Sequence, residues 1–480
     1  MSKYIANISD CCGCSVCLSV CQCMAITMKP NDLGFLYPCI DEDLCIECGD
    51  CKDVCPVLET NLNKMVNLFD KKAYTGYLVD NIELLTSTSG GFANAISKKI
   101  IEQGGCVFGV KYGDNFIPEY DVAYTEEELE VFKGSKYTEV NNNKLFECVK
   151  SELNVGKKVL VIGLPCVIAS LKKYINTNVN INNLYLCELI CGGYTSRRVL
   201  SELIEEMENK YESKVSSFIF RVKNPYVLPC YFQVGFENGI IESMKWNETY
   251  FEKAYRLIKR DSCYNCKFKN IELSYADFII GDHWGSENQM HYNKYGNSLI
   301  LPRTPKALAL IDSLEEQFFK IVEVDFEEAY KYNHMLSKSI TNLEGSNYLK
   351  EYFKKNSLKR ACELYNIKLK KELEEILSEI KGERYNVALW GVSMGIDNMY
   401  EKYDMKNWNI KYIFDSSEYK IGMNCHGLKV NNIKDIHKFN KKIDVIVSLI
   451  SSTDCVVLKK QLLENGWKGK TFYMGKYRFI

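Results

Sequence analysis

The sequence predicts a mixed α/β (α+β) fold in three main parts: a short cysteine-rich module, a large α/β core and a small C-terminal Rossmann-like domain. Three observations predict this organisation. The cysteines of the first 60 residues repeat one spacing twice. Continuous apolar runs, which suit buried parallel strands, recur through the middle of the chain. A pattern of strand, glycine turn and helix begins again near residue 385, and 480 residues exceed what a single core usually holds.

Composition narrows the classes of function. The formal net charge is -1, so nothing in the charge balance favours a nucleic-acid partner. The first ten residues lack the apolar region of a signal peptide, and the longest apolar run, residues 159–171, is interrupted by Gly163 and Pro165. We therefore expect a cytoplasmic protein without a membrane span. Its 22 cysteines then indicate reduced thiols that bind metal, in an anaerobic or low-oxygen cell.

Eight cysteines in residues 1–60 follow the spacing Cys-x2-Cys-x2-Cys-x3-Cys, once in each of two runs. In two-cluster ferredoxins the fourth cysteine of each run binds the other cluster. The pattern therefore predicts a ferredoxin module with two 4Fe-4S clusters. One is bound by Cys11, Cys14, Cys17 and Cys55, and the other by Cys45, Cys48, Cys51 and Cys21. Structural zinc is the alternative, although zinc modules usually separate their cysteine pairs by a dozen or more residues.

The first run departs from the usual pattern, because Gln22 stands where a proline is common. Three further cysteines in this module, Cys12, Cys23 and Cys39, are interpreted as bystanders that shield the clusters.

The core, predicted for residues 73–340, opens with a strand at 73–79, a helix from Phe92 and a strand at 106–110. The corner Ser89-Gly90-Gly91 places a hydroxyl and bare backbone amides at the helix N-terminus, which favours a phosphate or an electron-rich ring edge. This corner is a candidate cofactor cradle. The alternative is a serine N-cap with glycines for a tight entry. A second glycine corner, residues 133–137, is equally open.

Three apolar runs end in groups that can carry chemistry. Residues 158–163 lead to Cys166, residues 182–190 to Cys191, and residues 275–281 to the Asp282-His283-Trp284 group. Ligands of parallel α/β sheets bind beyond the carboxyl ends of the strands, so we expect these groups to converge.

A third 4Fe-4S cluster is predicted from four thiols, which are Cys166, Cys191, Cys263 and Cys266. The competing interpretation is buried structural cysteine for the first two and zinc for the Cys263-x2-Cys266 pair. Cys187 is an alternative ligand, but strand alternation would point it away from Cys191.

Residues 341–383 are predicted to form a helical connector and residues 384–480 the Rossmann-like domain. Asp415 follows the glycine turn by about twenty residues, as in dinucleotide-binding units. The glycine fingerprint is incomplete, with only Gly391 and Gly395 present, so nucleotide binding is left open.

Taken in order, the motifs of residues 1 to about 340 resemble the family of coenzyme F420 hydrogenase/dehydrogenase beta subunits. The resemblance rests on the ferredoxin-type start and on segments 89–91, 134–137, 163–166, 190–192, 262–266 and 281–285. It implies a core that binds FAD and a 4Fe-4S cluster. It places flavin binding at Ser89, Gly90, Gly91, Ser135, Lys136 and Tyr137, and the core thiols at Cys166, Cys191, Cys263 and Cys266.

The expected protein is an iron–sulfur flavoprotein oxidoreductase that moves electrons between 4Fe-4S clusters and, through FAD, a hydride carrier or organic substrate. Lys136 and His283 are candidates for charge stabilisation or proton delivery, although a core histidine donating to a carbonyl is the alternative for His283. The expected partner is a redox protein or small electron donor. Val167 and Gly192 replace the glutamine and histidine usual in the family, which leaves the substrate and use of the deazaflavin open.

Two further interpretations remain. The C-terminal domain resembles domains fused to enzymes of surface-polysaccharide assembly, which suggests a reductive step on a glycan precursor. The alternative to an enzyme is a non-enzymatic iron–sulfur subunit that delivers electrons to a separate catalytic partner.

Overall fold

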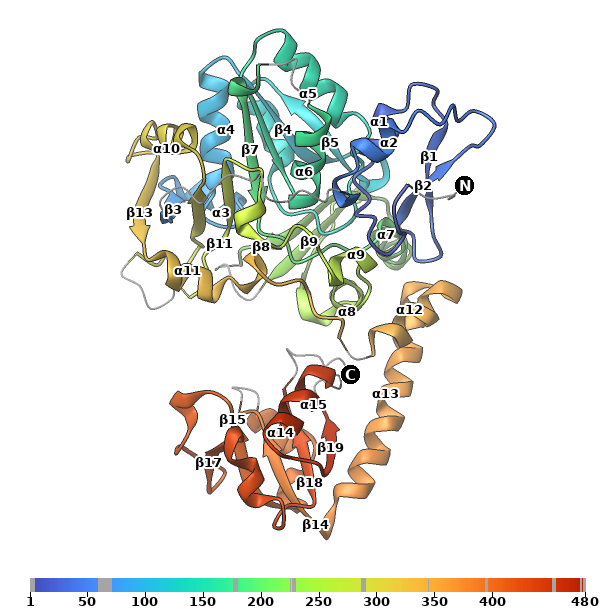
Figure 1. Cartoon of the computed structure of the whole chain (residues 1–480), viewed down its shortest axis with the longest axis vertical. Helices are drawn as coiled ribbons and strands as arrows, with labels where there is room; N and C mark the ends of the chain where they lie inside the picture. The colour runs from blue at the N-terminus through green and yellow to red at the C-terminus, as the bar shows by residue number, and fades with distance from the viewer. Residues whose placement is uncertain are drawn as a thin grey trace. The chain divides into compact units, whose positions relative to one another are not determined.

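The structure is a computed structural model, which describes residues 5–58, 71–175, 180–224, 226, 230–285, 291–343, 345–392, 396–450, 455–474 and 477. The chain divides into two compact units, Met1–Ile340 and Thr341–Ile480 (Figure 1). Both units combine helices with β-sheets, so the predicted mixed α/β class is confirmed.

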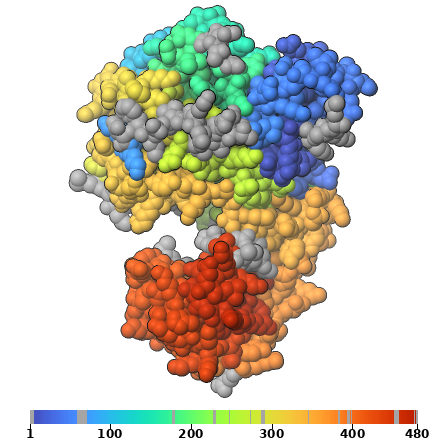
Figure 2. All heavy atoms as spheres, in the orientation of Figure 1, coloured from blue at the N-terminus to red at the C-terminus, as the bar shows by residue number. Residues whose placement is uncertain are grey.

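The N-terminal segment is built from short elements around its two cysteine runs. Helix α1 (Val16–Val20) contains Cys17, and helix α2 (Asp50–Asp53) contains Cys51. Between them, strands β1 (Ile26–Pro30) and β2 (Leu36–Ile40) form an antiparallel hairpin. Figure 2 shows the atoms of this segment, in dark blue, packed against those of the core.

The core contains an eight-stranded sheet in the order β13-β3-β12-β11-β7-β6-β4-β5. Its strands are β3 (Ala73–Leu78), β4 (Cys106–Tyr112), β5 (Pro118–Ala123), β6 (Val159–Gly163), β7 (Leu184–Leu189), β11 (Phe278–Asp282), β12 (Ser298–Pro302) and β13 (Phe319–Val324). Strands β4, β6, β7 and β11 are parallel, and the remaining pairs are antiparallel. The carboxyl ends of β6, β7 and β11 therefore lie at one edge, as predicted.

Side-chain alternation divides the core into two layers. Val159 and Val161 of β6 pack on the face covered by helices α5 (Leu145–Asn154) and α6 (Pro165–Tyr174). Leu160 packs on the opposite face, with helices α4 (Phe92–Glu102) and α10 (Pro305–Asp312). The N-terminal segment joins the α5/α6 layer through buried Cys12, Cys14 and Cys17.

The rest of the first unit consists of further helices and a smaller sheet. It comprises α3 (Asn81–Thr86), α7 (Arg197–Tyr211), an antiparallel sheet of β8 (Val215–Val222), β9 (Tyr231–Phe236) and β10 (Ile241–Lys245), and helices α8 (Tyr250–Leu257), α9 (Asp261–Tyr264) and α11 (Phe326–Tyr332).

The second unit begins with helices α12 (Ser346–Lys355) and α13 (Leu358–Ile380). Its six-stranded sheet has the order β16-β17-β15-β14-β18-β19, and only β16 runs antiparallel to its neighbour. The strands are β14 (Gly382–Trp390), β15 (Trp408–Asp415), β16 (Asn424–Cys425), β17 (Leu428–Asn432), β18 (Val445–Ser448) and β19 (Lys470–Tyr473). Across the described parts of both units, no helix has the length and apolarity needed to span a bilayer.

Candidate metal centre

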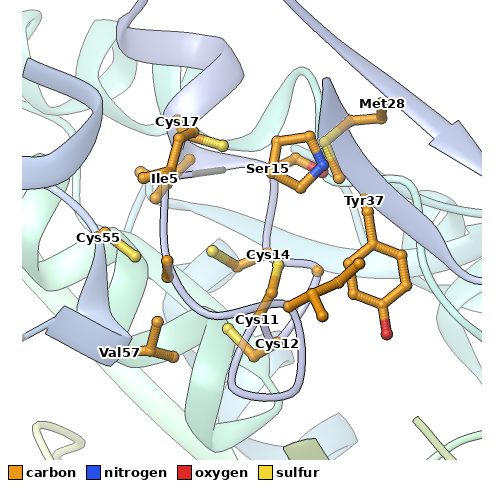
Figure 3. A pocket seen from close by; sticks show the side chains of 15 residues that line it. Ile5, Cys11, Cys12, Cys14, Ser15, Cys17, Met28, Tyr37, Cys55 and Val57 are labelled. Atoms are coloured by element: carbon orange, nitrogen blue, oxygen red, sulfur yellow. The ribbon is translucent and has the colours of Figure 1, made fainter. Parts of the chain in front are cut away.

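The first predicted cysteine set surrounds a cavity of about 30 Å³ (Figure 3). The cavity is lined by Cys11, Cys14, Cys17 and Cys55, together with apolar side chains such as Ile5 and Val57. Burial raises the pKa of the Cys17 thiol, and the neighbouring Cys14, Cys11 and Cys55 raise it further. Four thiols in an apolar wall are a donor set that fits a 4Fe-4S cluster.

The second predicted set lies closer to solvent. Burial raises the pKa of the Cys51 thiol, and nearby Cys48, Cys21 and Cys45 add to the effect, so the four side chains are electrostatic neighbours. Cys48 is exposed, whereas Cys14, Cys17 and Cys55 of the first set are buried. Of the two sets, the second is therefore the more accessible from outside.

The third set comes together at the edge where the parallel strands end. Cys166 lies in the first turn of α6, Cys191 follows β7, Cys263 is in α9, and Cys266 follows α9. The pKa of Cys263 is raised to about 12 by burial and by the thiols of Cys191 and Cys266, although Lys259 lowers it. The contact with Cys12 lowers the pKa of Cys166, but burial and the thiols of Cys191 and Cys266 raise it above its ordinary value. The structure thus brings the four predicted core thiols together.

Cys187 occupies a different environment. It is buried in the layer that contains α4, whereas Cys166 is buried in the layer that contains α6. Strand alternation in β7 therefore directs Cys187 away from the third set.

Among the described residues, no three or more His, Cys, Asp or Glu side chains are placed to hold one metal ion together. A tetrahedral zinc site requires four ligands on the same atom. A 4Fe-4S cube offers a separate iron to each of its four thiolates, so its ligands can stand further apart. The two kinds of centre therefore need different ligand spacings, and the iron and zinc content of the purified protein tells them apart.

Cys12 connects the first set with the third. Its thiol lies in hydrogen-bonding contact with the thiols of both Cys14 and Cys166. The backbone carbonyl of Cys12 accepts a hydrogen bond of 2.6 Å from the Tyr194 hydroxyl. A continuous path of sulfur atoms therefore leads from the N-terminal segment into the core.

A buried ion pair fastens the loop of the first set to the core. Arg260 is 0% exposed and donates from Nη1 to Oε1 of Glu139, which is 2% exposed, at 2.7 Å. Arg260 also donates to the Cys11 carbonyl at 2.7 Å and the Leu36 carbonyl at 2.8 Å. Glu139 in turn accepts from the Leu36 N–H at 2.9 Å. We call these four residues the Arg260 clamp.

The glycine corner predicted to cradle a cofactor is closely packed by the protein itself. A Cβ added to Gly90 would lie 2.1 Å from the Gly76 carbonyl oxygen, and one added to Gly91 would lie 2.3 Å from a methyl carbon of Leu78. Gly91, at φ +84°, is the N-cap of α4, and Ser89 donates to the Asn297 carbonyl at 2.6 Å instead of capping the helix. Packing and backbone conformation therefore account for both glycines.

The second glycine corner contacts the residue that precedes the first corner, because the Ser135 hydroxyl donates to Thr88 Oγ1 at 3.2 Å. Lys136 folds back and donates to four carbonyls of residues 131–134, at 2.9–3.4 Å. Burial lowers the pKa of Lys136 to about 7. The ammonium group of Lys136 thus binds the backbone of its own loop.

Tyr137 leads to a site that the motifs did not indicate. Its ring packs edge-on against Phe220 and Trp246, and its hydroxyl lies in hydrogen-bonding contact with Arg221. Arg221 forms a two-pronged ion pair with Asp282, at 2.7 and 3.2 Å. The buried Nε–H of Arg221 has no acceptor among the described residues. This donor is the feature near the predicted flavin segments that best fits a bound cofactor.

His283 is 5% exposed, and its Nδ1 lies 2.8 Å from the Thr75 hydroxyl. The backbone N–H of His283 donates to the Asn297 carbonyl at 3.0 Å. These contacts match the interpretation of a core histidine, except that the side-chain partner is a hydroxyl.

Sequence reasoning missed the roles of Cys12, Glu139 and Arg221. Arg260 flanks the Cys263 pair, but nothing local signalled its partner 121 residues away. For Cys12 the available signal was its position inside the first cysteine run.

The fold and the site define the class of protein. It is a cysteine-rich α/β protein in which an N-terminal segment with a duplicated cysteine spacing packs on a mixed sheet, and further cysteines lie beside that sheet. Residues 156–326 match the family described as coenzyme F420 hydrogenase/dehydrogenase, C terminus of the beta subunit. The core of this chain is therefore similar to the beta subunits of this family. Residues 382–471 match the CoA binding domain family.

The chain is also similar to individual proteins. It is 27% identical to the F subunit of the F(420)H(2) dehydrogenase of Methanosarcina mazei over 191 residues, which are 38% of this chain and 53% of that protein. The match thus spans about half the length of that relative. A chain of the F420-reducing [NiFe] hydrogenase complex of Methanosarcina barkeri is 18% identical, with a TM-score of 0.39, covering 61% of this chain and 94% of that one. A Rex-family repressor is 24% identical, with a TM-score of 0.17, covering 24% and 54%.

Proposed function

We propose that this chain is an iron–sulfur oxidoreductase subunit that carries electrons between a redox partner at its N-terminal segment and an acceptor at the core. The observation that carries the proposal is the path of thiols through Cys12, which links Cys14 of the first set to Cys166 of the third. Without such a path, two groups of cysteines in one unit could be unrelated structural sites. The match of residues 156–326 to the F420 hydrogenase/dehydrogenase beta-subunit family supports the same conclusion.

The three sets have different exposures, and this favours a direction of entry. The second set, with exposed Cys48, is the one that a partner can approach most closely. The first set is buried between the N-terminal segment and the α5/α6 layer. Bound at these cysteines, 4Fe-4S clusters would supply single-electron transfer. The residues proposed to bind them are the eight N-terminal cysteines and Cys166, Cys191, Cys263 and Cys266.

The Arg260 clamp holds the first set at a fixed place on the core. Because Arg260 donates to the Cys11 carbonyl, and Cys263 lies one turn further along the chain, one side chain positions loops of two cysteine sets. Its positive charge, buried beside Cys11, also favours the more negative state of a group bound there.

FAD is proposed as the cofactor that exchanges single electrons for a hydride. The supports are the family resemblance and the unpaired Nε–H of Arg221, close to Tyr137. The donor and acceptor molecules, including the deazaflavin coenzyme, and the roles of Lys136 and His283 in proton delivery remain predictions. A role in surface-polysaccharide metabolism is likewise a prediction.

A second candidate function is a non-enzymatic electron-transfer subunit. It is favoured by the packing at Gly90 and Gly91 and by the use of Lys136 within its own loop, because these residues then need no cofactor.

One experiment separates these candidates. Anaerobically purified protein should contain about twelve irons per chain with three clusters, or about eight with the N-terminal pair alone. The enzyme also requires bound FAD and reduction of a two-electron acceptor. If protein with its full iron content binds no FAD, even when FAD is supplied in excess, the enzyme is excluded and the electron-transfer subunit is supported. Zinc in place of iron would refute both.

A further inference from the structure

Cys23 lies beside the fourth predicted ligand of the second set. Its Sγ is 3.6 Å from Sγ of Cys21. Residues 21–24 form a tight turn, in which the Met24 N–H donates to the Cys21 carbonyl at 3.1 Å and Met24 adopts φ +54°. This turn, which contains Gln22 in place of a proline, brings the two thiols to the same side of the chain.

Cys23 also contacts the loop that carries the second set. The backbone N–H of Ile46, directly after Cys45, donates to the Cys23 sulfur. Cys21, for its part, is an electrostatic neighbour of Cys51. Both thiols of this turn therefore lie against the segment that carries the second set.

The distance between the two sulfurs matches a shared metal position. A tetrahedral metal atom binds thiolate sulfur at about 2.3 Å, so two sulfurs 3.6 Å apart can both reach one atom. A small rotation of either side chain is then enough to make or break its bond to that atom.

We propose that Cys23 is an exchangeable fourth ligand, alternative to Cys21, for a cluster held by Cys45, Cys48 and Cys51. The inference rests on the proposed function, because it requires a cluster at the second set. In the exchange, the Cys23 thiol loses its proton and its sulfur bonds to the iron that the Cys21 sulfur leaves. Cys21 then takes up a proton. One Fe–S bond forms and one breaks, and no oxidation state changes.

The other unassigned N-terminal thiols serve as comparisons. Cys39 lies on β2 opposite Thr27 of β1, and Cys12 is engaged with Cys14 and Cys166. Removing Cys39 together with Cys21 should therefore resemble removing Cys21 alone.

The test uses the full chain purified without oxygen, as Cys21→Ala, Cys23→Ala, the double variant, and Cys21→Ala/Cys39→Ala as matched control. Both single variants and the control should keep the wild-type iron content. The double variant should lose about one iron per chain and show the EPR signal of an oxidised three-iron cluster, or lose about four irons. A three-iron signal or iron loss in Cys21→Ala alone would overturn the proposal.

Alkylation of native protein gives a second measurement. With Cys21 bound to iron, the peptide that contains residues 21–23 should carry one alkylated thiol, on Cys23. In Cys21→Ser, which keeps the side-chain size if the alanine variant folds poorly, Cys23 should be protected. Full alkylation of Cys23 in that variant would contradict ligand exchange. Cys51→Ala shows whether a negative result concerns the ligand exchange alone or also the proposed function. Unchanged iron content in this variant would mean that the second set holds no cluster, which would refute both.

Discussion

Replacing Arg260 by methionine should detach the first cysteine loop from the core. The change removes the donor to Glu139 and the donors to the Cys11 and Leu36 carbonyls. Breaking a buried ion pair by removing one partner costs about 3–5 kcal/mol, because the other charge is left buried. Burial already raises the pKa of Glu139, and loss of Arg260 removes the main group that lowers it. Protonation of Glu139 then limits the cost, so we expect a loss of about 3 kcal/mol in the free energy of unfolding.

The assay is hydrogen–deuterium exchange of peptides from residues 5–58, combined with chemical denaturation of the anaerobic protein. Exchange at Leu36, whose N–H donates to Glu139, should accelerate most. In the matched control Arg260→Met/Glu139→Leu the orphaned carboxylate is absent, so part of the free energy of unfolding should return. An Arg260→Met protein within about 1 kcal/mol of wild type, with unchanged exchange at Leu36, would refute the clamp.

Three further predictions concern the proposed flavin side. Gly91→Val should lower the melting temperature even without flavin, because the new side chain clashes with Leu78 and a β-branched residue must adopt φ +84°. A variant that keeps the wild-type melting temperature but loses FAD would instead support the hypothesis that Gly91 is required for cofactor binding. Because the folded-state pKa of Lys136 is lowered to about 7, the folded protein binds fewer protons than the unfolded chain between about pH 7 and 10. The free energy of unfolding should therefore rise with pH in that window. Lys136→Met should flatten this slope, measured in denaturation curves, by at most about 1.4 kcal/mol per pH unit. Parallel curves for the variant and wild type would contradict the shift. Arg221→Met should weaken the affinity for FAD, measured by titration, at least tenfold, while the iron content stays constant. An unchanged affinity would show that Arg221 does not contact the flavin.

Much of the fold was predictable because its signals are local. The apolar runs before Cys166 and Cys191 became parallel neighbours β6 and β7, since strands buried on both faces need continuous apolar sequence. The glycine-to-helix transition at Gly91 became the start of α4. The resemblance to the F420 hydrogenase/dehydrogenase beta subunits was confirmed through the core.

The unpredicted features depend on long-range contacts. The packing at Gly90 involves the backbone of Ser298, more than 200 residues further along the chain. The sequence alone could not show this neighbour, so a glycine that the strand packing requires was interpreted as one that a ligand requires. Lys136 matched a motif, but its use depends on how its loop folds back onto residues 131–134. The cluster ligands, the flavin residues and the domain boundaries stay predictions.

The Arg260 clamp also constrains how the protein is made. Cys11 leaves the ribosome first, and Arg260 is synthesised 249 residues later. At about 5–20 residues per second, that interval is roughly 12–50 s. Throughout this interval the thiols of the first set lack the clamp, and until residues 165–174 are made they also lack helix α6. Cluster insertion before the core is complete would occur in an open loop, and insertion afterwards would have to pass a closed one. The time at which the first loop closes onto the core is thus set by the synthesis of a single arginine.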